Sequence, residues 1–102
     1  MYKLKLMFEW GGGTIWCEDD ATREKYGVGS IEERLPLSKE TLDKLEGLTA
    51  LHDTALNWEY PPDPSPWSKE QFTSFESQAL RMLEELRHEL GDQYEIQYRA
   101  LT

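Results

Sequence analysis

The chain has little of what catalytic and metal-binding sites are made of. Its 102 residues include a single cysteine, Cys17, and two histidines, His52 and His88. One cysteine excludes an internal disulfide and fits a reducing compartment. No cysteines and histidines have the spacing of a zinc site, and the acidic residues lack the graded spacing of a calcium loop. We therefore expect neither a bound metal nor a cofactor.

Long hydrophobic runs are absent as well. No apolar stretch approaches the roughly 20 residues that span a bilayer, and the alternating residues 1–8 are too short for a signal peptide. We expect a soluble cytoplasmic protein that does not bind membranes. A length of 102 residues suits a single domain with one core, which would occupy residues 1–102.

Positive charge is scarce. The chain has 11 Lys and Arg against 20 Asp and Glu, a net charge of −9, and residues 46–95 hold eleven acidic residues against three basic ones. The basic stripe that direct nucleic-acid binding requires is therefore missing. The acidic charge could speed the encounter with a basic protein partner. In the alternative, it only maintains solubility.

Alternation of apolar and polar residues predicts strands at both ends of the chain. Large apolar side chains occupy every second position over residues 2–10, and three glycines separate them from a second β-prone segment at 14–17. These two segments predict a hairpin. Further strands over 31–35 and 94–98 would join the sheet. Residues 18–27 are expected to form a loop or a short helical turn.

Two segments show helical periodicity, residues 38–56 and 68–90. Ser38 and Ser68 occupy N-cap positions, and Gln71 stands where a capping box places its second member. Trp67 can pack on Phe72 as a hydrophobic staple, and Gly91 can end the second helix. The elements together predict an α+β fold: a small, mainly antiparallel sheet of three or four strands with two amphipathic helices packed on one face.

The connector between these helices, residues 57–67, is rich in proline and aromatic residues and carries two carboxylates without a positive charge. Proline at this density makes a stiff surface connector. Trp and Tyr side chains often dominate interface energy, while carboxylates add association rate and selectivity. We interpret the connector as a partner-binding surface, built from Trp58, Glu59, Tyr60 and Asp63 together with the acidic run Glu18, Asp19 and Asp20. In the alternative, Trp58 and Tyr60 fold back onto the core.

Catalytic candidates are limited to Cys17 and the histidines. His52 lies on the apolar side of its helix beside Asp53, where a satisfied, partly buried histidine is more common than a general base. Cys17 could meet a histidine only in the folded chain. We predict that the protein is not an enzyme, and a small enzyme that uses Cys17 or His52 is the alternative.

The acidic run at 18–20, the cluster of Trp58, Glu59 and Tyr60, and the acidic helix at 68–90 give the chain its general character. In these features it resembles the small acidic immunity proteins of bacterial contact-dependent inhibition and polymorphic toxin systems. The resemblance implies a cytoplasmic inhibitor that binds a cognate toxin domain, often a basic nuclease, and blocks its active site. Two alternatives are a non-catalytic accessory subunit with an acidic solubilising surface, and a phage-type inhibitor whose carboxylates imitate the phosphates of nucleic acid.

Overall fold

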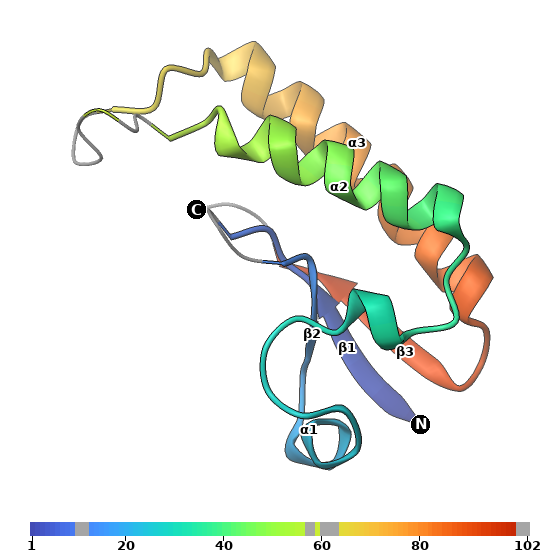
Figure 1. Cartoon of the computed structure of the whole chain (residues 1–102). Coiled ribbons are helices and arrows are strands. Elements are labelled where there is room, and N and C mark those ends of the chain that lie inside the picture. Colours follow the sequence, from blue (N-terminus) through green and yellow to red (C-terminus); the bar gives the residue numbers. More distant parts are fainter. Residues whose placement is uncertain (10–12, 57–58, 60–63, 100–102) are drawn as a thin grey trace.

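In the part of the chain that the structure describes, three strands and three helices follow one another. Figure 1 shows their arrangement. The computed structural model describes residues 1–9, 13–56, 59 and 64–99. The order is β1 (Tyr2–Leu6), β2 (Ile15–Cys17), α1 (Asp20–Tyr26), a 3₁₀ turn η1 (Glu32–Arg34), α2 (Lys39–Asp53), α3 (Lys69–Leu90) and β3 (Tyr94–Tyr98). The predicted α+β class is confirmed.

The strands form one sheet in the order β2-β1-β3. β1 runs antiparallel to β2, as the hairpin prediction requires, and its Leu4 lies opposite Cys17. β3 pairs with the other edge of β1 in parallel, with Leu4 opposite Ile96, so the sheet is mixed. The parallel pairing arises because α3 carries the chain back along the sheet before the turn at Gly91, so that β3 starts beside the start of β1.

The strand predicted over residues 31–35 is wrong. Only Ser30 bridges to Trp16 of β2, and η1 follows. Ile31 and Leu35 are both buried, as on a strand face, but a spacing of four residues places two side chains on one side of a helical turn equally well. The sequence pattern therefore could not separate these two conformations.

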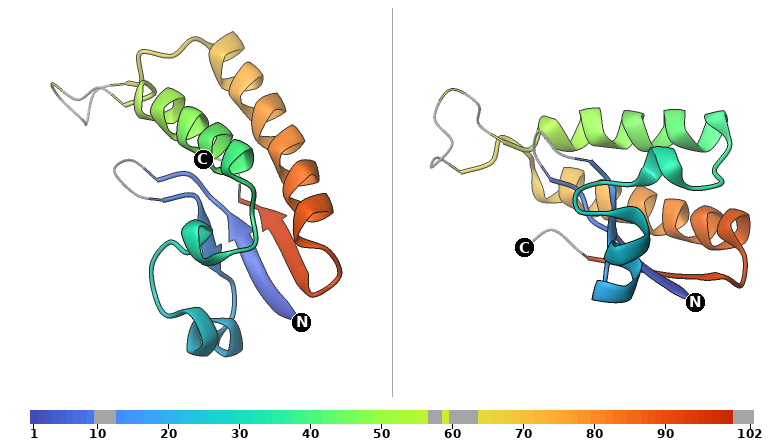
Figure 2. Two further views of the ribbon diagram at one scale, coloured as in Figure 1. Left: turned by 45° about the vertical axis from the view of Figure 1, so that its right-hand side comes forward. Right: turned by 60° about the horizontal axis from the view of Figure 1, so that its bottom comes forward.

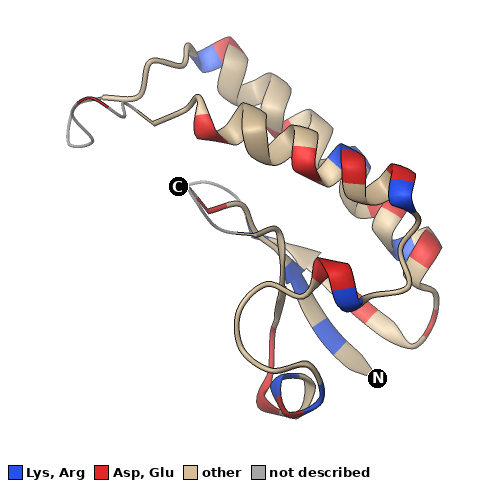
Figure 3. Ribbon diagram, viewed as in Figure 1, with Lys and Arg blue, Asp and Glu red and all other residues tan. Residues whose placement is uncertain are grey.

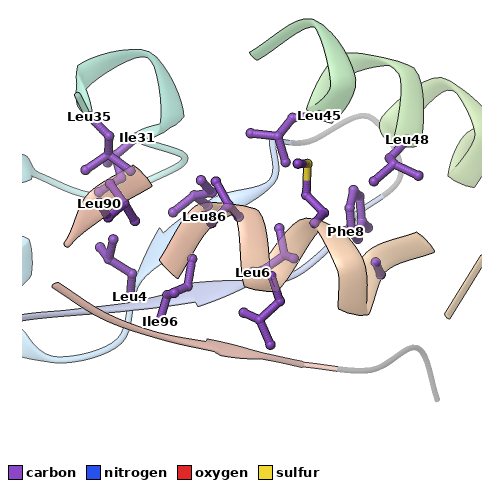
Figure 4. Close-up of a cluster of buried hydrophobic side chains, with 14 of the residues drawn as sticks. Leu4, Leu6, Phe8, Ile31, Leu35, Leu45, Leu48, Leu86, Leu90 and Ile96 are labelled. Carbon is purple, nitrogen blue, oxygen red and sulfur yellow. The ribbon is translucent and has the colours of Figure 1, made fainter. Parts of the chain in front are cut away.

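α2 and α3 cover one face of the sheet (Figure 2). Leu4, Leu6 and Phe8 of the N-terminal segment are buried. Figure 4 shows these side chains meeting Leu86 and Leu90 from α3 and Leu45 and Leu48 from α2. Leu4, Leu6 and Phe8 are therefore in the core, as the alternation predicted, while Trp10 lies outside the described residues. α1 lies away from the two long helices, and its Thr22 hydroxyl accepts a hydrogen bond of 2.9 Å from the Lys3 backbone N–H.

The predicted starts of α2 and α3 and the predicted end of α3 are confirmed by their caps. Ser38 accepts a hydrogen bond from the Thr41 N–H, and Ser68 forms a full capping box with Gln71. The Trp67 and Phe72 rings pack edge to face with centroids 5.1 Å apart. The indole N–H of Trp67 also donates to the Thr54 hydroxyl at 2.6 Å, which ties the end of α2 to the start of α3. Gly91 ends α3 with a φ of 77°, which favours glycine.

Candidate protein-binding surface

The predicted binding connector lies mostly outside the described residues. Trp58, Tyr60 and Asp63 are not among them, and the structure therefore leaves their role as a prediction. Glu59 is described and exposed. Trp67, at the end of the connector, is buried and belongs to the core.

The acidic run of residues 18–20 is tied into the fold. The Asp19 carboxylate caps α1 by accepting a hydrogen bond of 2.9 Å from the Thr22 N–H. Hydrogen bonds from Thr22 hold the pKa of Asp19 below its ordinary value. Asp20 pairs with Arg23 at 2.7 Å on the surface, and Glu18 forms an ion pair with Arg99. Figures 1 and 2 place α1 far from the end of α2 and the start of α3.

A different set of carboxylates gathers along α2. One hollow of about 470 Å³ lies between the start of α2 and the end of α3, and it is bordered by Glu40, Glu84, Glu85 and Glu89. A second hollow of about 450 Å³ lies on the other side of α2, and it is bordered by Glu32, Glu33, Asp43 and Glu46. We call these eight carboxylates, four from each hollow, the α2 acidic surface. Figure 3 shows acidic segments along α2, on η1 and at the adjoining end of α3.

Within the described residues, exposed ion pairs partly neutralise this surface, among them the pair of Arg87 with Glu84 at 3.0 Å. Two lysines, Lys39 and Lys44, border the hollows. Lys44 lies 3.3 Å from Glu85 and 3.7 Å from Glu40, but all three side chains are about half exposed or more. Exposed pairs of this kind contribute only about 0 to 1 kcal/mol. Their carboxylates therefore stay available to a cationic partner.

Glu89 has a structural role within the α2 acidic surface. Its carboxylate accepts hydrogen bonds from the Ser38 backbone N–H and, at 2.5 Å, from the Thr41 hydroxyl. The Thr41 hydrogen bond is the main cause that lowers the pKa of Glu89. The charge thus sits at the N-terminus of α2, where the helix dipole favours an anion.

The sequence contained a signal for this surface that the prediction did not use. Glu40, Asp43 and Glu46 recur at every third position of α2, so each lies beside the next on the helix surface, with Glu40 at the first hollow and Asp43 and Glu46 at the second. Their meeting with Glu32 and Glu33 could not be predicted, because it depends on the 3₁₀ turn that sequence patterns indicated as a strand.

The profile of the Serratia CdiI immunity protein-like family matches residues 2–101. The chain belongs to this family. A search of curated proteins found no match. The resemblance to immunity proteins of contact-dependent inhibition is thereby confirmed, and membership supports a role in immunity against a toxin.

The catalytic candidates occupy positions in this immunity-like protein that do not suit catalysis. Cys17 is buried, and burial raises the pKa of its thiol, which keeps it protonated and a poor nucleophile. His52 is 1% exposed, and its ring lies 5.6 Å from the Phe75 ring and 5.9 Å from the Phe8 ring. Burial lowers the pKa of His52, although Asp53 opposes this shift. The expectation of a core histidine is confirmed.

The described residues contain neither a metal-binding cluster nor a helix that could span a membrane. No group of three or more His, Cys, Asp and Glu side chains there is arranged to hold a metal ion. No helix of that part of the chain combines the length and the apolar character that crossing a membrane requires, although α3 has 22 residues.

Proposed function

We propose that this protein is a non-catalytic immunity protein that binds and neutralises a basic toxin domain through the α2 acidic surface. The observation that carries the proposal is the gathering of eight carboxylates in two hollows on either side of one helix. Family membership supports the immunity role. The basic character of the partner, most plausibly a nuclease domain, is inferred from the charge.

Complementary charge supplies speed and orientation to such a complex. A negative surface steers a basic partner into contact and rejects acidic proteins, nucleic acid and anionic membranes. Tight binding also needs apolar anchors. Leu51 on α2 and Leu80 on α3 are 38% and 51% exposed. In our proposal the connector residues Trp58 and Tyr60 supply further anchors, and the protein acts in the cytoplasm, where it meets the toxin domain.

A charge reversal on α2 tests the proposal. Asp43 is an exposed residue of α2 that borders the second hollow. We expect Asp43→Lys to weaken binding to the cognate toxin domain, taken as the one encoded beside this chain's gene, at least about tenfold, because a cation then faces a basic partner. Calorimetry measures the dissociation constant. Survival of cells that express the toxin domain measures neutralisation.

The matched control is Glu24→Lys, which makes the same change in net charge on the exposed surface of α1. We expect this variant to bind within about twofold of the unmodified protein. Equal losses in the two variants would show that only total charge matters. Unchanged affinity in Asp43→Lys would place the interface elsewhere, with the connector and the run at residues 18–20 as the next candidates.

A further inference from the structure

A third hollow lies between the two long helices and differs in character from the acidic ones. It has a volume of about 340 Å³ and lies between α2 and α3. Leu48, Leu51 and Met82 give it an apolar lining, with Gly47 and Gln78 beside them. The charged residues Lys44, Arg81 and Glu85 also border it. The hollow shares Lys44 and Glu85 with the acidic hollow at the start of α2. We call it the Gly47 groove.

Neither the backbone nor the packing of α2 requires a glycine at position 47. Gly47 lies inside a helix of 15 residues and is not among the described glycines with positive φ. A Cβ atom added there would meet no atom within 4 Å. Glycine inside a helix is less favourable than alanine and most other residues. Gly47 therefore makes α2 less stable than alanine would, and its missing side chain leaves the groove open.

We propose that the Gly47 groove receives an apolar side chain of the cognate toxin domain, as the anchor of a complex that the α2 acidic surface orients. This inference rests on the proposed function. A basic surface seated on the acidic hollow also reaches the groove, because Lys44 and Glu85 border both. An apolar pocket inside a charged rim is the usual arrangement of an energetically dominant contact. Leu51, 38% exposed at this groove, gains burial when it is filled.

The test is to fill the groove from within the protein by Gly47→Gln. The matched control is Ala50→Gln, which places the same side chain at an exposed position of α2 that does not border the groove. We expect Gly47→Gln to raise the melting temperature by about 4 °C, because it removes a helix-interior glycine. The same variant should weaken binding to the toxin domain at least about tenfold. Ala50→Gln should bind within about twofold of the unmodified protein.

The opposite signs of these two effects separate a binding role from a structural one. Toxin binding by Gly47→Gln with unchanged affinity would overturn the groove proposal while the proposed function stands. A lower melting temperature together with weaker binding would also overturn it, because the glycine would then serve the fold. Failure of the unmodified protein to bind the toxin domain would refute the proposed function and the groove proposal together.

Discussion

At the scale of single residues, polar side chains divide into those that complete the fold and those that face solvent. Asp19 and Ser38 cap helices, and Glu89 bonds to the N-terminus of α2 from the neighbouring helix. Asp43 and Glu46, in contrast, are exposed on the surface of α2. Carboxylates of the first kind contribute to stability, whereas those of the second kind are the ones a partner can reach.

His52 is the residue that should make stability depend on pH near neutrality. Its pKa is lowered in the folded protein, chiefly by burial, so the unfolded chain binds a proton more readily. Stability is therefore full above the unfolded-state pKa of about 6.5 and is lost as the pH falls below it. One proton taken up on unfolding corresponds to at most about 1.4 kcal/mol per pH unit. We expect the melting temperature to fall between pH 7.5 and pH 5.5.

The variant His52→Leu identifies the group responsible. The leucine places an apolar side chain beside the rings of Phe8 and Phe75, and this side chain cannot take up a proton. Calorimetric scans should show a flatter dependence of the melting temperature on pH for this variant than for the unmodified protein. Equal slopes over this range would exclude His52 as the source. Asp19 and Glu89, whose pKa values are lowered, lose their contributions only at more acidic pH.

At the scale of elements, the end of α3 stabilises the start of α2. Glu89, in the last turn of α3, accepts hydrogen bonds from the Ser38 N–H and the Thr41 hydroxyl. Its carboxylate therefore stabilises the start of α2, although Thr41 lies 48 residues earlier in the chain. We expect Glu89→Gln to lower the free energy of unfolding by about 1 kcal/mol at pH 7, because the charge at the helix N-terminus and a strong acceptor are lost. Urea unfolding measures the difference.

Glu46→Gln is the control for this prediction. Glu46 is an exposed residue of α2, and no hydrogen bond or ion pair is found for it in the described part of the chain. Its replacement should change stability by less than about 0.5 kcal/mol. An effect of Glu89→Gln as small as that of Glu46→Gln would mean that water replaces the carboxylate at the start of α2.

The elements that the sequence predicts well are those whose signals are local. α3 combines a capping box, a staple and an apolar stripe, and its observed ends are those that these signals predict. Phe75, Ala79 and Leu86 of the stripe are fully buried. β1 alternates clearly and β3 follows a glycine. α2 ends at Asp53 rather than near Leu56, as expected for helix boundaries, which carry weaker signals than helix interiors.

Features that depend on contacts between distant segments were harder to predict. The parallel pairing of β3 follows from the path of α3 over the sheet, and η1 has the same buried spacing as a short strand. The candidate site was limited in the same way. Charge composition predicted an acidic binding protein, but the meeting of η1, α2 and the end of α3 exists only in the folded chain.

At the scale of the whole molecule, α2 and α3 carry a net negative charge, with nine acidic residues against five basic ones, whereas β1 carries two lysines and no acidic residue. Glu40, Asp43 and Glu85 lie on the layer formed by α2 and α3, whereas Lys3 and Lys5 of β1 alternate with core residues and point to the other face of the sheet. Figure 3 shows this division between the helices and β1. In our proposal, this distribution of charge orients the basic partner before contact, toward the face that contains the Gly47 groove.

This arrangement predicts that salt and groove filling act on different rate constants. Long-range attraction governs the encounter, so raising the ionic strength from about 0.02 M to 0.5 M should slow association with the toxin domain at least about tenfold and change dissociation little. Short-range packing governs the lifetime of a complex, so Gly47→Gln should mainly speed dissociation.

Asp43→Lys should slow association and flatten its dependence on salt. Surface plasmon resonance with the toxin domain immobilised measures both constants. An association rate that salt leaves unchanged would show that the net charge of −9 serves solubility alone and not recognition.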